Sequence, residues 1–304
     1  MNVDSEAAVD TVVERIRRVY RSWGRGVPVE RMRADWDALF ANPPDDATRE
    51  TIDADGVPCC WVAGPDVRTD RTVLYLHGGG FQVGSTTSHA ELMAAISRAA
   101  GCRVLGVDYR RAPEHTFVDA ASDVMTAYRW ICRLHGTARA VIVAGDSAGG
   151  NLALTLGIDA RDGTDGEMAP RALVLLSPWT DLTASGASYE TRAAADPIHQ
   201  RPMIRALADA CLRGSLPASD PRASPLFARL SGLPPLLIQV GDRETLLCDA
   251  TVLADRARAA GVDVSLQVWD GMIHVFQQFP GELPQARDAI DAIGAFVATC
   301  FDRP

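Results

Sequence analysis

Several residue types and patterns are missing from this 304-residue sequence, and each absence excludes a class of protein or site. It contains no lysine, so all 30 of its basic residues are arginine, a bias to which we assign no function. Its seven cysteines are irregularly spaced and include no pair of C-x-x-C units, which argues against a zinc site. We therefore expect no metal, and thiols that are reduced and mostly buried, as in a cytoplasmic protein.

Long apolar runs and an excess of positive charge are also missing. No stretch of about 18 apolar residues occurs, so we expect no transmembrane helix. The first residues show no basic region followed by an apolar run, so we predict no secretory signal and a cytoplasmic location. The formal net charge of −9 has the wrong sign for binding phosphate backbones, which argues against nucleic acid as a partner.

What the sequence does contain is a regular alternation of short apolar runs and longer helical patterns. The runs lie at 72–76, 104–107, 140–144, 172–176, 235–240 and 264–268, and the helical patterns at about 87–100, 117–134, 148–160, 247–260 and 283–299. Several runs lack polar alternation, as is typical of strands covered on both faces. The pattern predicts an α/β protein with a mainly parallel central sheet flanked by helices on both sides.

Two stretches depart from this alternation. Residues 5–41 read as two helices broken around 24–28, and residues 181–224 are polar and proline-rich around a helical piece near 201–213. We expect one domain, 1–304, with a helical cap built from about 1–41 and 181–224 over the sheet edge where ligands bind. Trp36, Leu39 and Phe40 are spaced to share one helix face, which would either line this cap or pack as ordinary core.

The sharpest motif is Gly145-Asp146-Ser147-Ala148-Gly149, which directly follows a predicted strand and precedes a predicted helix. A nucleophile elbow turns so sharply at this point that the residues two before and two after the nucleophile must be small. The alternative is a structural turn or a phosphate-binding loop, but the lysine or G-x-G-x-x-G spacing of such loops is absent. We therefore predict that Ser147 is a catalytic nucleophile.

Three consecutive glycines support this prediction. The strand predicted at 72–76 is followed by His77-Gly78-Gly79-Gly80-Phe81. Glycines lose more backbone entropy on folding than other residues, so three in a row suggest that the backbone here has a specific function. We expect the backbone N–H groups of Gly78, Gly79 and Ala148 to form an oxyanion hole. A flexible surface loop is the alternative, and it would not explain why the run abuts a buried strand. His77 itself is expected to order the loop.

Chain order selects the base, because proteins with a nucleophile elbow of this kind place the nucleophile first along the chain, the acid second and the histidine last. Of six histidines, only His199 and His274 follow Ser147. His199 lies in the polar stretch without a preceding strand, whereas His274 follows the last predicted strand, so we predict that His274 is the base. The acid is Asp242 or Glu244, both just beyond the strand at 235–240, and residue spacing does not choose between them.

Several motifs match a known family in the same order along the chain. Besides the two glycine-rich motifs, they are Asp108-Tyr109-Arg110, Ala112-Pro113-Glu114-His115, Gly150-Asn151, Ser177-Pro178-Trp179-Thr180-Asp181 and Gly271-Met272-Ile273-His274. From about residue 70 to the C-terminus, the sequence resembles the bacterial hormone-sensitive-lipase-like esterases, alpha/beta hydrolase family 3. The resemblance implies an α/β-hydrolase fold, and its acid position falls on Glu244 of Glu244-Thr245-Leu246, where the family usually has aspartate. It also implies ordering roles for Asp108, Arg110, Glu114, Asp146 and Asp242.

The implied activity is hydrolysis of short- to medium-chain carboxylic esters through a serine acyl-enzyme, with lactones and acetylated small molecules as further candidate substrates. The catalytic residues would be Ser147, Glu244 and His274, and no cofactor would be needed. The alternatives are a non-catalytic small-molecule receptor on the same fold, and an acyltransferase or amidase that uses the same triad. A homodimer is left open.

Overall fold

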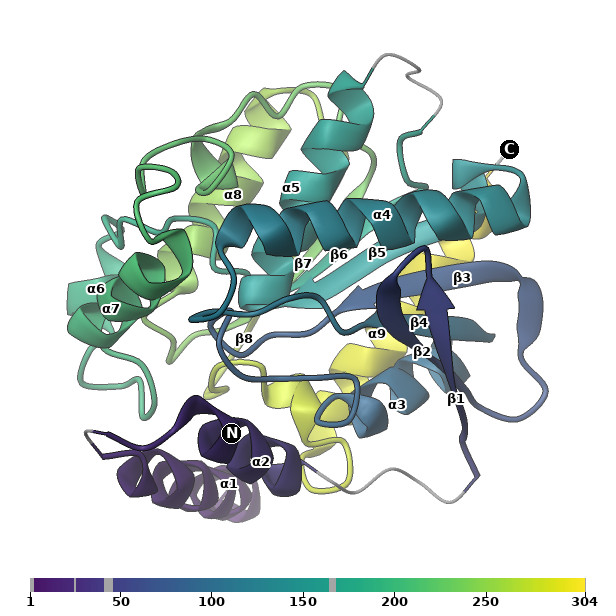
Figure 1. The fold of residues 1–304 in the computed structure, drawn as a ribbon. Helices are drawn as coiled ribbons and strands as arrows, with labels where there is room; N and C mark the ends of the chain where they lie inside the picture. Colours follow the sequence, from purple (N-terminus) through teal and green to yellow (C-terminus); the bar gives the residue numbers. More distant parts are fainter. Residues whose placement is uncertain (1–2, 25, 41–45, 164–167, 304) are drawn as a thin grey trace.

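The computed structural model describes residues 3–24, 26–40, 46–163 and 168–303, and an eight-stranded sheet runs through its centre (Figure 1). The strands are β1 (Thr48–Ala54), β2 (Val57–Ala63), β3 (Arg68–Leu76), β4 (Cys102–Val107), β5 (Val141–Asp146), β6 (Leu173–Leu176), β7 (Leu236–Gly241) and β8 (Val264–Trp269). Their spatial order is β1-β2-β4-β3-β5-β6-β7-β8. The six strands from β3 onward pair in parallel, and β2 pairs antiparallel with both β1 and β4.

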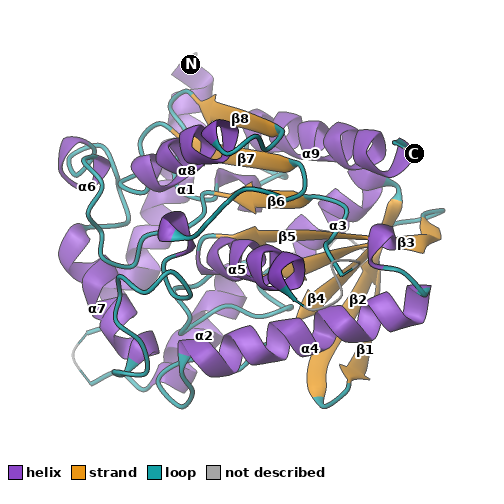
Figure 2. Cartoon of the chain, turned by 90° about the horizontal axis from the view of Figure 1, so that it is seen from above, coloured by secondary structure: helices purple, strands orange, loops and turns teal. Residues whose placement is uncertain are grey.

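Helices cover both faces of the sheet (Figure 2). On one face lie α4 (Phe117–His135), α5 (Ala148–Asp162) and α8 (Leu247–Ala259), and on the other lie α3 (Ala90–Ala100) and α9 (Pro284–Asp302). Alternate side chains of each central strand enter the two cores: Leu74 packs on the α4 side, and Val73 on the α3 side. Three short 3₁₀ helices, at Ala138–Ala140, Pro225–Phe227 and Phe276–Gln278, complete the elements.

The antiparallel hairpin of β1 and β2 was not anticipated from the sequence. Most of β1 is exposed, so it lacks the apolar run by which a buried strand is recognised. The sequence of the turn did carry a signal, the pair Asp55-Gly56. Both residues adopt positive φ, 57° and 88°. An Asp-Gly pair between β-rich segments is typical of a tight hairpin turn.

Four helices lie outside the strand–helix alternation: α1 (Val3–Ser22), α2 (Val29–Leu39), α6 (Ser188–Thr191) and α7 (Arg201–Leu212). The buried face of α1, which includes Val12 and Ile16, belongs to the same apolar cluster as Met272 and Phe276 from the segment after β8. Trp36 of α2 stacks edge-on against Phe40, with 5.1 Å between ring centroids. The cap at 1–41 and 181–224 stays a prediction, and its residues 1, 2, 25 and 41 lie outside the described residues.

The sheet order, its parallel pairing and the helices on both faces define an α/β-hydrolase fold, as expected. Within the described ranges, no helix is long and apolar enough to cross a membrane. The carboxyl ends of β5, β6, β7 and β8 meet at one edge of the sheet. The segments that follow these four strands carry Ser147, Ser177, Glu244 and His274.

Candidate active site

Ser147 stands at a sharp turn between β5 and α5. Its φ of 52° and ψ of −116° are strained for a residue with a side chain. A Cβ added to Gly145 would lie 2.4 Å from the Gly149 carbonyl oxygen, and one added to Gly149 would lie 2.0 Å from the Leu76 carbonyl oxygen. Neither position can hold a larger residue, as the elbow motif requires. The Ser147 N–H donates to the Leu176 carbonyl at 2.9 Å, which ties the turn to β6.

His274 lies in the loop after β8, and its Nδ1 is 2.7 Å from Oε2 of Glu244. The second oxygen of Glu244, Oε1, accepts hydrogen bonds from the Ser177 hydroxyl and from the Gly241 N–H, each at 2.6 Å. Glu244 is fully buried. With both its oxygens engaged, the carboxylate cannot rotate, and it holds the imidazole with Nδ1 as the donor.

Of the two candidate acids, the structure brings Glu244 to His274 and does not bring Asp242. Oδ1 of Asp242 accepts the N–H of Gly271 at 2.7 Å. Asp242 therefore secures the loop that leads to His274, which is the ordering role that the family resemblance implied. The shorter side chain is used on the backbone, and the longer one reaches the imidazole.

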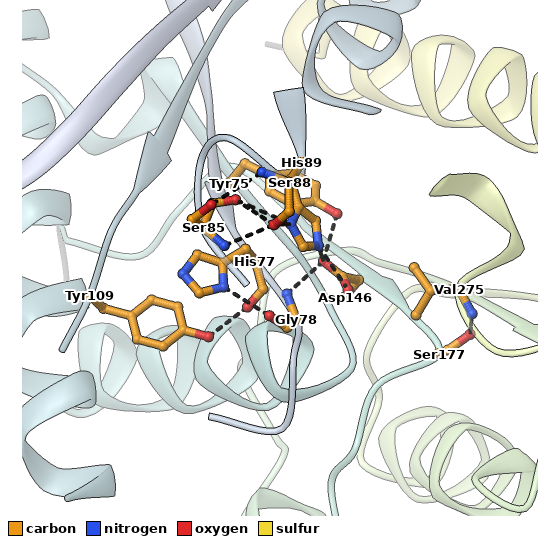
Figure 3. A network of polar contacts seen from close by, with 10 residues as sticks. All are labelled: Tyr75, His77, Gly78, Ser85, Ser88, His89, Tyr109, Asp146, Ser177 and Val275. Atoms are coloured by element: carbon orange, nitrogen blue, oxygen red, sulfur yellow. Dashed lines mark hydrogen bonds and ion pairs between the residues drawn. The ribbon is translucent and has the colours of Figure 1, made fainter. Parts of the chain in front are cut away.

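Ser177 belongs to this site, although the sequence analysis assigned it no role. It follows β6 with a φ of 43°, and its hydroxyl oxygen accepts the Val275 N–H at 3.1 Å (Figure 3). Its hydroxyl proton goes to Glu244. Ser177 therefore links the acid to the residue after His274. Its position directly after a predicted strand, at the same sheet edge as Ser147, was the signal that could have identified it.

Two opposing effects act on the protonation of His274. Burial disfavours the charged ring, but the charge of Glu244 and its hydrogen bond outweigh burial and raise the pKa of His274 above its ordinary value. The ring of His199 approaches edge-on, with centroids 4.5 Å apart and planes at 80°. Burial, followed by the nearby His274, lowers the pKa of His199 to about 3, so His199 is neutral. Nothing in the sequence indicated that these two histidines meet.

The glycine run after β3 differs in one respect from expectation. The N–H of Gly78 donates to Oδ1 of Asp146 at 2.9 Å (Figure 3). Gly78 does not line the cavity above Ser147. The expectation that Gly78 contributes to an oxyanion hole is therefore wrong in this geometry, because its donor is already used. Gly79 and Gly80 do line that cavity, and in the described part of the chain no protein acceptor takes their N–H groups. Ala148 is the first residue of α5, as expected.

The residues expected to order nearby loops do contact them. His77 stacks on Tyr109 with centroids 4.3 Å apart, and burial lowers the pKa of His77 to about 3. Asp108 accepts the Thr86 N–H at 2.8 Å. Arg110 pairs with Asp123 at 2.7 Å, and Glu114 pairs with Arg33 of α2 at 2.7 Å.

A cavity of about 360 Å³ lies over Ser147 and His274. Its wall is mainly apolar and draws on α1, α2, α7 and the loop after β8: Ile16, Tyr20, Trp23, Met32, Trp36, Phe40, Met203, Ile204, Leu207 and Phe279 are among its residues. Its volume lies near the lower end of the range for small-molecule sites. Among the residues that the structure describes, no three His, Cys, Asp or Glu side chains are placed to hold a metal ion.

Comparisons with known proteins agree with this geometry. The model of a family described as having the alpha/beta hydrolase fold matches residues 73–278. An acetyl-hydrolase of Streptomyces hygroscopicus is 42% identical over 79% of each chain, and an esterase of Acinetobacter venetianus is 33% identical over 79% of this chain and 80% of its own. A crystal structure of an esterase from the bacterial hormone-sensitive lipase family superposes with a TM-score of 0.92 at 41% identity, covering 97% of this chain and 98% of that one.

The chain therefore belongs to the alpha/beta hydrolase fold family, and within it to the esterases that resemble hormone-sensitive lipase. It is a serine carboxylesterase, an enzyme that hydrolyses carboxylic esters.

Proposed function

We propose that Ser147, His274 and Glu244 form the catalytic triad of this esterase. The observation that carries the proposal is the buried Glu244–His274 pair at 2.7 Å, whose histidine lines the same cavity as the strained Ser147. Because Nδ1 of His274 donates to Glu244, Nε2 is the nitrogen left to take the Ser147 proton. The pair thus supplies the tautomer that a general base needs.

The reaction runs in two steps through an acyl-enzyme. His274 takes the Ser147 proton as the serine oxygen attacks the ester carbonyl, and the imidazolium then protonates the departing alcohol. Water repeats the sequence on the acyl-serine and releases the acid. Glu244 stabilises the imidazolium in both steps without itself becoming protonated.

The oxyanion of each tetrahedral intermediate would be held by the N–H groups of Gly79, Gly80 and Ala148. The support for this set is that Gly79 and Gly80 line the cavity and have no protein acceptor among the described residues. The α5 N-terminus, which begins at Ala148, adds its positive dipole end. Donors aimed at a developing charge contribute more than donors that also bind the ground state.

We further propose that the substrates are short- to medium-chain acyl esters, with α1, α2 and α7 acting as the cap that limits chain length. The small apolar cavity, walled by Trp36 and Phe40, supports this range, because a longer chain needs an open groove to leave water. Lactones and acetylated small molecules fit the same chemistry. The chain would work as a hydrolase rather than transferring the acyl group to an alcohol or amine.

A panel of substrates tests this function. Initial rates are measured with p-nitrophenyl esters of increasing acyl length, with lactones and with amides, each with and without added alcohol. We expect the highest kcat/KM for short to medium acyl esters and release of free acid. Exclusive formation of transfer products, or a maximum at long chains, would contradict the proposal.

A further inference from the structure

Asp146, the residue before the nucleophile, is a buried carboxyl group with an unusual set of partners (Figure 3). It is 3% exposed, and its Oδ1 accepts the N–H of Gly78 and the hydroxyl of Tyr75, both at 2.9 Å. His89, which is 1% exposed, places Nε2 3.2 Å from the same oxygen. In the described part of the chain, no arginine pairs with this carboxylate, so His89 is its ion partner.

The other side of the His89 ring also faces hydrogen-bond acceptors. Nδ1 lies 3.3 Å from the carbonyl oxygen of Ser85 and 3.0 Å from Oγ of Ser88. The Ser88 hydroxyl directs its own proton to the Ser85 carbonyl at 3.1 Å and accepts the Ser85 N–H at 2.9 Å, so its oxygen has one further lone pair to accept a proton from Nδ1. An imidazole nitrogen can donate a hydrogen bond only when it carries a proton. Because both nitrogens of His89 face acceptors, one of them a carboxylate, both hydrogen bonds form only when both nitrogens are protonated.

The charge of Asp146 matters because this residue lines the same cavity as Ser147. A carboxylate without a counter-charge at this position would repel the oxyanion that forms during acyl transfer, and in a buried site that repulsion is weakly screened. Burial opposes ionisation of Asp146, but the neighbouring His89 and the hydrogen bond from Tyr75 together outweigh burial, and the pKa of Asp146 is lowered. His77, whose ring centroid is 5.7 Å from that of His89, stays neutral, so it adds no second positive charge.

We propose that His89 is a positioning residue of the esterase: as a buried imidazolium it cancels the charge of Asp146 and keeps this carboxylate bound to the Gly78 N–H, so that the following N–H groups remain beside Ser147. The proposal rests on the proposed triad and oxyanion hole. It is specific to charge, because a neutral side chain that only filled the space would leave Asp146 uncompensated. The close approach of the loop supports it: a Cβ on Gly78 would lie 2.1 Å from Oδ2 of Asp146.

The protonation state can be observed directly in the unmodified enzyme. The protein is labelled with ¹⁵N-histidine, and the His89 signals are assigned from their absence in His89→Gln. At the pH of the activity assay, we expect both ring nitrogens of His89 to carry protons, because both face acceptors. A single protonated nitrogen at that pH would overturn the proposal, whatever the variants do.

Kinetics then test whether the charge affects catalysis. His89→Gln keeps a donor to Asp146 but removes the positive charge, so we expect kcat to fall roughly tenfold to a hundredfold while KM stays within about twofold. Adding Asp146→Asn keeps an acceptor for Gly78 and removes the negative charge. The double variant should therefore recover about tenfold in kcat over His89→Gln alone. A double variant no faster than the single one, or an unchanged kcat in His89→Gln, would overturn the proposal.

The matched control is His135→Gln on α4. His135 also bonds a neighbouring side chain, with Nε2 2.8 Å from the Thr72 hydroxyl, but it does not line the cavity. We expect this variant to keep its kcat within about twofold. Failure of the proposed function would be recognised separately, because activity would then survive in Ser147→Ala. If Ser147→Ala is inactive and the His89 results are negative, only the present proposal fails.

Discussion

At the scale of single residues, the acid of the site shows how side-chain length and partners decide a role. Glu244 has one oxygen on His274 and uses the other for Ser177 and Gly241. A carboxylate held by three donors is fixed in place and loses little entropy when the imidazolium forms. The extra methylene of glutamate lets the carboxylate reach from the loop after β7, while Asp242 in the same loop binds backbone.

The first prediction at this scale concerns the nucleophile. Ser147→Ala removes the attacking oxygen, and its smaller side chain fits the elbow, so we expect kcat to fall by several orders of magnitude with the fold intact. A serine-directed phosphonate should modify the wild type at Ser147 alone, as seen by peptide mass spectrometry. Circular dichroism of the variant provides the folding control. Labelling at another residue, or full activity in the variant, would reject Ser147.

The second prediction concerns the acid and the pH profile. Activity should fall at low pH as His274 becomes protonated. Because Glu244 raises the pKa of His274, this acid limb of the kcat/KM profile should lie at a higher pH than the ordinary pKa of histidine. Glu244→Gln removes the raising charge and leaves burial, which lowers this pKa. We therefore expect the limb to move to lower pH, and kcat to drop by roughly 10²- to 10⁴-fold.

Asp242→Asn is the matched control for that variant. The asparagine oxygen can still accept the Gly271 N–H, so kcat should fall by no more than a few-fold and the pH profile should stay in place. If Asp242→Asn instead loses more activity than Glu244→Gln, with both proteins folded, Asp242 would be the acid.

The residues of the site differ in how far the sequence reveals them. Ser147 and His274 follow from an elbow motif and from chain order, both of which are local signals. The choice between Asp242 and Glu244 depends on loop geometry, and only the family resemblance favoured Glu244. Gly78 was misassigned because the motif does not show that Asp146 takes its N–H, a contact between residues 68 positions apart.

At the scale of elements, the central strands could be predicted because both their faces are buried. The strands β4 to β8 coincide with the expected apolar runs to within two residues at each end. The expected run at 72–76 covers only the buried end of β3, since residues 68–70 are exposed. The hairpin of β1 and β2 was missed for the same physical reason, because an exposed strand carries no apolar run. Helix α1 was expected, but its packing against the residues around Phe276 depends on long-range contacts.

The prediction that belongs to this scale concerns the wall that α2 contributes to the cavity. Trp36 lines the cavity and contacts the rings of Tyr20, Trp23 and Phe40. Trp36→Ala enlarges the cavity, so the acyl length with the highest kcat/KM should increase by two or more carbons, at roughly 0.8 kcal/mol per newly buried methylene. The same ester panel measures this change.

Glu30→Ala is the control on the same helix, since Glu30 is exposed and lies away from the cavity. Its chain-length profile should match that of the wild type. Thermal unfolding of both variants shows whether Trp36→Ala acts only by loosening the fold. An unchanged profile in a folded Trp36→Ala protein would mean that α2 does not set substrate length, and attention would move to Leu207 and Met203 of α7.

At the scale of the whole molecule, acidic side chains are buried far more often than arginines. The buried acids are Asp123, Asp146, Asp181, Asp196, Glu244 and Asp249, and no arginine in the described ranges is buried to the same degree. Most of these carboxyls are held by backbone N–H donors around the catalytic edge of the sheet: Asp196, for example, accepts from Ile198, His199 and Thr245. The pKa values of Asp146 and Asp196 are lowered and that of Asp249 is raised, so the ionisation of these three groups links stability to pH.

Asp249 provides the clearest test of this linkage. It is 1% exposed, Oδ2 accepts the N–H groups of Thr180 and Asp181 at 2.8 Å, and burial raises its pKa well above the ordinary value. A carboxyl whose folded-state pKa is raised stabilises the fold fully below its unfolded pKa of about 3.9, and loses that contribution as the pH rises toward the folded value. Asparagine keeps the acceptor and cannot ionise, so Asp249→Asn should unfold at a higher temperature than the wild type at about pH 8.

The difference in unfolding free energy between Asp249→Asn and the wild type should decrease toward about pH 5, with a slope of up to roughly 1.4 kcal/mol per pH unit. Calorimetric scans across this range measure it, with the exposed Asp209→Asn as the control expected to show no such trend. A variant equally destabilised at every pH would instead show that the charge of Asp249 is needed by its two backbone donors.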